Sequence, residues 1–158
     1  MKKTMKLKIR TLATFVLVAL TIGLFSLAQS TSAGSNCHVV KGNLSGSGGS
    51  GTITQGGRLN GTTQAVFTSV FTATPDPTTF SFTDDLTVTT NHNGVLKTHN
   101  VGIFDGATGL FSAIDRIDPT ASTGNFAGAT GVLYINGRSN DGGMTIQAEI
   151  TGEICLAN

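Results

Sequence analysis

The stretch Gly124–Gly137, GNFAGATGVLYING, joins a glycine-rich turn to a strand. Its closely spaced glycines permit the positive backbone φ and the close chain approach that tight turns need. Val132–Ile135 follows, and its β-branched and aromatic residues are typical of a strand. Phe126 is the large apolar residue within the turn, so we expect its side chain to anchor the turn in the core. The predicted structural turn consists of Gly124, Phe126, Gly128 and Gly131.

Beyond residue 33 the chain alternates between short strands and turns. In Thr79–Thr90 the Phe, Leu and Val residues share one parity, with Thr and Ser between them, as in a half-buried strand. Turn signals such as Asn93-Gly94 separate the strands, and no helical period occurs. We therefore predict an all-β barrel or sandwich of about eight strands. The expected strands are Cys37–Leu44, Thr52–Thr54, Thr62–Ala73, Thr79–Thr90, Val95–Phe104, Leu110–Asp118, Val132–Ile135 and Met144–Cys155.

Two glycine-rich segments near the start of this domain are predicted to be irregular. Gly46–Gly51, GSGGSG, has the composition of a flexible connector. It also spells GxGxxG, but the strand-like Thr52–Thr54 follows it, whereas a dinucleotide site needs a helix there. Gly56-Gly57, just before Arg58, indicates a bulge or a corner. We expect no cofactor.

The glycine turn carries a family resemblance. Thr123–Gly131, TGNFAGATG, resembles the GTGxFxGATG turn of the allene oxide cyclase barrel-like superfamily, which includes the plant dirigent proteins. The chain is also similar to small secreted bacterial members of unassigned function, at Val101–Asp105, Leu110–Ala113 and Gly152–Leu156. The resemblance extends from Cys37 to Leu156 and implies an eight-stranded antiparallel β-barrel. The shared turn is architectural, so the resemblance does not by itself imply cyclase activity.

Residues 1–33 have the pattern of a cleavable secretory signal helix. Five basic residues lie within the first ten positions, and the apolar run Leu12–Ala28 follows. Small residues precede Ala28 and Ala33, so we predict cleavage after one of these two alanines. The alternative is an uncleaved anchor, although the apolar run is short for a membrane span. We expect a secreted or periplasmic bacterial protein whose single β-barrel domain comprises residues 34–158.

The predicted mature domain is mildly acidic. The whole chain has 10 basic and 9 acidic residues, and removal of the five basic residues of the signal leaves a net charge of −4. An acidic surface is unsuited to nucleic acid or to anionic lipid. We therefore expect no nucleic-acid partner and no membrane association after signal cleavage.

Cys37 and Cys155 lie at opposite ends of the predicted domain. In an exported protein an even pair of cysteines favours a disulfide. The bond would join the first strand to the last, which are neighbours in a closed barrel. The alternative is a pair of buried thiols.

The predicted domain carries no recognisable catalytic motif. It has no GxSxG elbow, and its histidines have neither HxH nor HExxH spacing, so we expect no metal site. Asp84 falls on the apolar parity of its strand, so either a bulge at Asp84–Asp85 shifts the register or the carboxylate points inward. An inward Asp84 would have a raised pKa and could donate or accept a proton. Arg58 is a candidate partner for Asp84 or a candidate anion anchor.

We expect a non-catalytic protein that binds a small apolar ligand or a surface partner, because eight-stranded barrels can enclose one small ligand. The sparse charge and the Phe-rich strands favour this function. One alternative is a cyclase, isomerase or dirigent-like template that acts in the barrel cavity through Asp84 or Arg58. Another is a structural cell-surface protein, for which an exposed apolar face on Thr62–Ala73 would be the sign.

Overall fold

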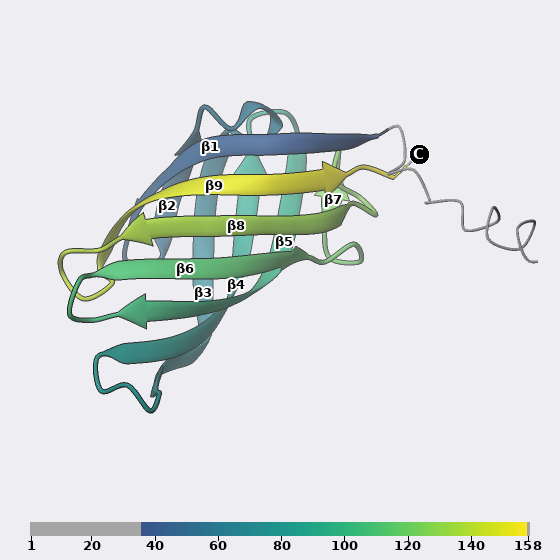
Figure 1. Ribbon diagram of the computed structural model, residues 1–158. Helices are drawn as coiled ribbons and strands as arrows, with labels where there is room; N and C mark the ends of the chain where they lie inside the picture. The colour runs from purple at the N-terminus through teal and green to yellow at the C-terminus, as the bar shows by residue number, and fades with distance from the viewer. Residues whose placement is uncertain (1–35, 158) are drawn as a thin grey trace, which may run out of the picture. The chain divides into compact units, whose positions relative to one another are not determined.

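The computed structural model describes residues 36–157, and the predicted signal segment lies outside them. Within this range nine strands and one short 3-10 helix follow one another (Figure 1). Most strands alternate buried with exposed residues, as the sequence pattern predicts. The elements are β1 (Cys37–Ser47), β2 (Ser50–Thr54), η1 (Gly57–Leu59), β3 (Gly61–Ala73), β4 (Thr79–Thr90), β5 (Gly94–Asp105), β6 (Leu110–Ile117), β7 (Thr123–Gly124), β8 (Thr130–Arg138) and β9 (Thr145–Cys155).

Eight of these strands close into an antiparallel barrel. The hydrogen-bonded order is β4-β3-β2-β1-β9-β8-β6-β5, and the pairing of β4 with β5 joins the two ends of the sheet. The ninth strand, the two-residue β7, pairs with the beginning of β5. In Figure 1, β1, β9, β8 and β6 lie side by side across the front wall. The eight-stranded antiparallel barrel is therefore confirmed, and the sandwich alternative is wrong.

The inward-facing side chains of the barrel form one apolar core. Its most buried large members come from six different strands or turns, so the core ties the whole wall together. The described range contains no helix that could span a lipid bilayer. Core residues include Val40, Leu44, Ile53, Leu59, Leu86, Val88, Leu96, Ile117, Phe126, Leu133, Ile150 and Ile154.

The glycine turn before β8 is built as the sequence predicts. Gly124, Gly128 and Gly131 have φ values of 61°, 70° and 140°. Phe126 is 2% exposed and packs against Gly94, where an added Cβ would lie 2.7 Å from the phenyl ring. The turn thus anchors one end of the barrel through Phe126.

We expect Gly124→Ala to destabilise the protein by about 1–3 kcal/mol, because it combines a left-handed backbone with a steric clash. A Cβ on Gly124 would collide with the backbone oxygen of Asn93. Gly48→Ala is the matched control, since Gly48 has φ 57° but nothing within 4 Å of an added Cβ. Urea denaturation should show a larger loss for Gly124→Ala, and equal losses would contradict the clash.

The prediction of a flexible connector at Gly46–Gly51 is wrong. The segment instead contains the end of β1, the start of β2 and a two-residue hairpin turn at Gly48-Gly49. Both turn residues have positive φ, 57° and 83°, as a type I′ turn requires. Composition alone indicated flexibility here, but pairing with the neighbouring strands orders the glycines. The corner predicted at Gly56-Gly57 is present, and η1 begins there.

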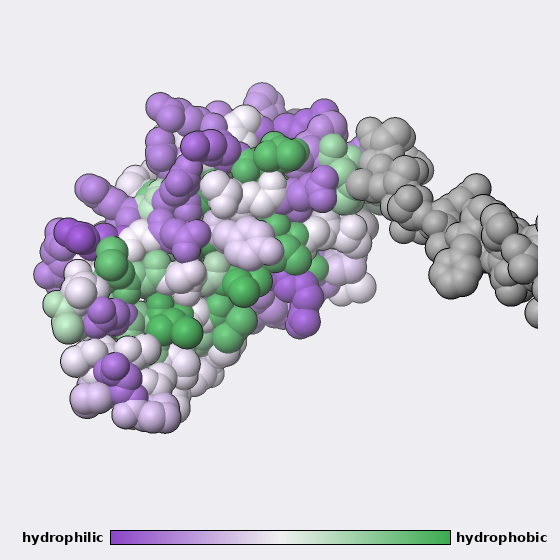
Figure 2. Space-filling view, in the orientation of Figure 1, coloured by the Kyte–Doolittle hydropathy of each residue, from purple (hydrophilic) through white to green (hydrophobic). Residues whose placement is uncertain are grey.

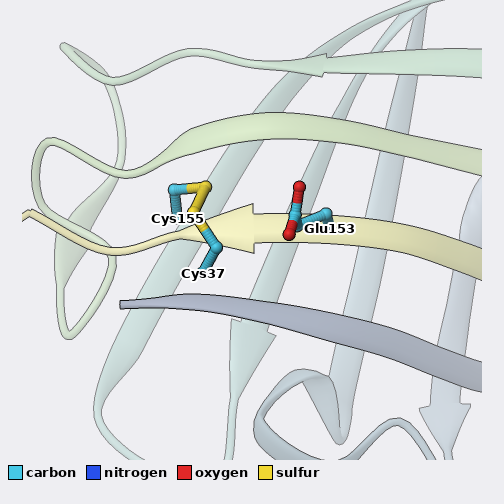
Figure 3. A group of neighbouring side chains, drawn as sticks. All are labelled: Cys37, Glu153 and Cys155. Carbon is cyan, nitrogen blue, oxygen red and sulfur yellow. A yellow bond between two sulfur atoms is a disulfide. The ribbon is translucent and has the colours of Figure 1, made fainter. Parts of the chain in front are cut away.

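A disulfide joins Cys37 and Cys155 where β1 meets β9, as predicted (Figure 3). The two residues are paired in the register of these strands, and their Cα atoms lie 3.8 Å apart. Glu153 is close by, with ligand-type atoms of the three side chains within 4.8 Å of one another. Because both sulfur atoms are bonded to each other, they offer no thiolate to a metal ion. The cluster is a disulfide bond with a carboxylate beside it and not a metal site.

Apolar side chains also gather on the outer wall. Figure 2 shows them over β5 and β6. Val101, Ile114 and Tyr134 stand opposite one another on β5, β6 and β8, and about half of each side chain is exposed. Ile103 and Leu110 have similar exposure on the same strands. Exposed apolar side chains also occur in Thr62–Ala73, where Val66 and Phe67 are 59% and 46% exposed, so the outer wall has apolar residues on more strands than the one considered in the sequence.

Candidate functional site

The candidate site is a cavity of about 90 Å³ inside the barrel. It lies toward the end of the barrel that the β8–β9 hairpin covers, since Ser139 and Gly143 of that hairpin line it. The disulfide lies at the opposite end of β9. Most lining residues are apolar, and the polar side chains among them are Asp84, Asn100 and Ser139. The apolar lining residues are Leu44, Ala65, Phe67, Phe71, Phe82, Leu86, Phe104, Phe111, Ala113, Ile135 and Ile146.

A cluster of phenylalanines forms one wall of the cavity. The ring of Phe71 lies 5.2 Å from that of Phe104 and 5.9 Å from that of Phe82, measured between centroids. Phe67 lies 6.0 Å from Phe82 in an edge-to-face arrangement, which aromatic pairs prefer. Phe67 and Phe71 are 46% and 36% exposed, whereas Phe82 and Phe104 are buried. Phe67 and Phe71 are therefore the lining side chains that solvent reaches most.

Two bulges in β3 determine where the rings of Phe67 and Phe71 lie. The register between β3 and β4 shifts twice, between Phe67 and Ser69 and between Ser69 and Thr72. Both irregularities lie on β3, so of the two alternatives for Asp84 the bulge at Asp84–Asp85 is wrong and the inward-pointing carboxylate is the one observed. β4 continues its alternation through this region, and the side chain of Asp84 stays on the inner face. Bulges bend a strand and redirect its side chains.

Three buried polar side chains form a row across β4, β5 and β6, beside the phenylalanines. Asp84 on β4 stands opposite Asn100 on β5, and Asn100 stands opposite Asp115 on β6. All three side chains are buried, with exposures of 4%, 8% and 0%. The hydroxyl of Thr98 donates a 2.6 Å hydrogen bond to Oδ1 of Asp115. The interior thus contains two carboxyl groups on strands that flank the strand of one amide.

Burial raises the pKa of both carboxyl groups. Loss of hydration raises the pKa of Asp84 to about 7, and the negative charges of Asp115 and Asp85 add to this, while a hydrogen bond from Asn100 opposes it. Loss of hydration also raises the pKa of Asp115 to about 6, against the hydrogen bond from Thr98. A pair of carboxyl groups with such pKa values can hold or exchange a proton near neutral pH.

Two acceptors of this row lack a partner. Among the described residues, Oδ1 of Asn100 and Oδ2 of Asp115 are buried atoms without a hydrogen bond. A buried acceptor left unpaired costs free energy, so most such atoms in proteins are satisfied. Asn100 lines the cavity, but both of these oxygens are sealed from solvent, so the polar side chain of the row that is left to face a bound molecule is Asp84.

Arg58 does not belong to this site. It is exposed on η1, between β2 and β3 at the disulfide end of the barrel. Asp84 pairs with Phe67, which lies roughly 20 Å along β3 from Gly61, at about 3.3 Å per residue. The predicted partnership of Arg58 with Asp84 is therefore wrong, because the corner that carries Arg58 is at the other end. In the described range the ion pairs join Lys41 to Glu149, and His99 to Asp85 and Asp118, in exposed or half-buried positions.

The sequence located Asp84 but missed Asn100 and Asp115. Asp115 shares the parity of Ala113 and Ile117, both of which are buried, and this alternation was the available signal. Asn100 lies in a strand that was correctly predicted, yet only the register between β4, β5 and β6 brings it beside the two aspartates.

In comparisons with protein-family models, curated proteins and solved structures, this chain matched none. The assignment of function therefore depends on the geometry of the barrel interior.

Proposed function

We propose that this protein binds a small apolar molecule in the cavity of its β-barrel. The observation that carries the proposal is an aromatic cavity of about 90 Å³ whose lining includes the half-exposed Phe67 and Phe71. Ligand sites are typically concave and apolar, with a few polar groups that orient the ligand. Asp84 fills that polar role here.

The volume suggests how a ligand would lie. An apolar cavity of about 150 Å³ in another protein accommodates benzene, so this cavity would enclose a smaller group. The rest of a ligand would rest against the half-exposed rings of Phe67 and Phe71. The site therefore suits an elongated molecule with one end buried.

We further propose that the protein acts outside the cytoplasm and belongs to the allene oxide cyclase barrel-like superfamily. The disulfide supports the first point, because such bonds persist in oxidising compartments. The closed eight-stranded barrel and the glycine turn with Phe126 in the core support the second. A secretory signal in residues 1–33 stays a prediction from the sequence.

A second candidate function is an isomerase, cyclase or template for coupling in the same cavity. It is favoured by one observation: Asp84 is an inward ionisable group whose pKa, near 7, suits proton transfer. Chemical analysis of molecules released from the protein would separate the two functions. A binding protein releases its ligand unchanged, whereas an enzyme converts it and Asp84→Asn stops the conversion.

Toluene is a suitable first probe, because its methyl group is small enough for the cavity and its ring would rest against Phe67 and Phe71. We expect it to shift the NMR resonances of lining side chains such as Leu44, Leu86 and Ile135, in a saturable manner. Ala65→Leu should abolish these shifts, because Ala65 lines the cavity and the larger side chain would fill it. Ala107→Leu is the control, since Ala107 is exposed in a turn outside the cavity. Absence of saturable shifts in the wild-type protein would overturn the proposal.

A further inference from the structure

We propose that the cavity selects apolar molecules that carry a protonated amine, with the ammonium group held by Asp84. The inference rests on the proposed function and specifies the class of ligand. Its basis is a buried carboxyl group, Asp84, that lines an aromatic cavity and has no counter-ion among the described residues.

The polar row offers more acceptors than donors. Asp84 and Asp115 are acceptors when ionised, and the donors directed at them are the amide of Asn100 and the hydroxyl of Thr98. Oδ1 of Asn100 has no donor in the described part of the protein. Above the pKa of Asp84, where its carboxyl group is ionised, a ligand that fits this row must therefore supply hydrogens rather than accept them.

The charge of the row favours a cation over a neutral donor. Asp84 is buried, and its carboxylate takes part in none of the ion pairs among residues 36–157. A buried carboxylate without a counter-ion is costly, and an ammonium group would neutralise it while donating up to three hydrogen bonds. Charge-assisted hydrogen bonds of this kind are about twice as strong as neutral ones.

The phenylalanine cluster suits an organic cation. Phe67 and Phe82 line the cavity together with Asp84, and the faces of aromatic rings attract ammonium groups. A hard metal ion needs six or more oxygen ligands, whereas the polar side chains that line the cavity are Asp84, Asn100 and Ser139. The apolar walls would instead contact the hydrocarbon part of an amine.

Three probes of nearly the same shape test the inference: benzylamine, benzyl alcohol and toluene. The dissociation constants of the three probes are measured by NMR titration of the protein at pH 8 and compared. We expect benzylamine to bind roughly tenfold or more tightly than either neutral probe, because a hydrogen bond to a charged group contributes about 1.5–3 kcal/mol. Asp84→Asn should remove this preference and leave the affinity for toluene unchanged.

Asp85→Asn is the matched control, since Asp85 is the adjacent residue and is exposed on the outer face. It removes the same charge from the same strand and should keep the preference for benzylamine. Equal affinities for the three probes, or a preference that survives in Asp84→Asn, would overturn the inference while the proposed function stands. Failure of all three probes, toluene included, would instead contradict the proposed function.

Discussion

Asp84→Asn is expected to stabilise the protein at alkaline pH by as much as about 4 kcal/mol. Burial raises the pKa of Asp84 from its ordinary 3.8 to about 7, and each pKa unit corresponds to about 1.4 kcal/mol. Below pH 3.8 the carboxyl group is protonated in both the folded and the unfolded protein. Between pH 4 and 7 the unfolded chain releases the proton and the folded protein retains it, so the wild type loses stability as the pH rises. An amide at this position carries no charge at any pH and avoids that loss.

The measurement is the free energy of unfolding by urea from pH 3.5 to pH 8.5. The difference between Asp84→Asn and the wild type should be small at the acidic end, grow from about pH 4 and become constant above about pH 7. Asp85→Asn is the control, because its exposed carboxylate faces solvent and the ring of His99. A difference that does not change with pH would show that the Asp84 carboxyl group is not desolvated in solution.

Loss of the disulfide should lower the free energy of unfolding by as much as about 4–5 kcal/mol. The bond closes a loop between residues separated by 118 positions, and the chain-entropy model gives this upper value for a loop of that length. The double variant Cys37→Ser/Cys155→Ser should therefore unfold at a lower urea concentration than the wild type. The two hydroxyl groups are close in size to the sulfur atoms, so most of the effect comes from the unfolded chain.

Reduction of the wild type provides the matching test. Reductant should add two mass units to the intact protein and lower its stability to about that of the double variant. The double variant itself should not respond to reductant. A wild type that is equally stable with and without reductant would show that the pairing of β1 with β9 does not depend on the disulfide.

Much of the fold was predictable from local sequence patterns. Alternation of apolar residues located the long strands, and in Thr79–Thr90 the predicted and observed bounds coincide. The glycine turn was predictable because positive φ demands particular residues at particular positions. The segment Gly46–Gly51 was mispredicted because the glycines that favour flexibility also suit a type I′ hairpin turn. Only strand pairing distinguishes the two outcomes.

The candidate site was predictable only where one strand carried the signal. Asp84 departed from the apolar alternation of its own strand, and that departure identified it. Asn100 and Asp115 are ordinary polar residues of their strands, and their importance comes from the neighbours they face. The pairing of Arg58 with Asp84 was wrongly predicted, because the sequence does not show at which end of the barrel each charged residue lies.

Local steric and hydrophobic preferences determined the strands and the turns, since these depend on residues near one another in the sequence. The pairing of the two cysteines followed from their places on the first and last strands, which are neighbours in a closed barrel. The tertiary structure alone decided the register of β4, β5 and β6 and the bulges of β3. These features depend on hydrogen bonds between separate strands, and they bring Asp84, Asn100 and Asp115 into one row beside the phenylalanine rings.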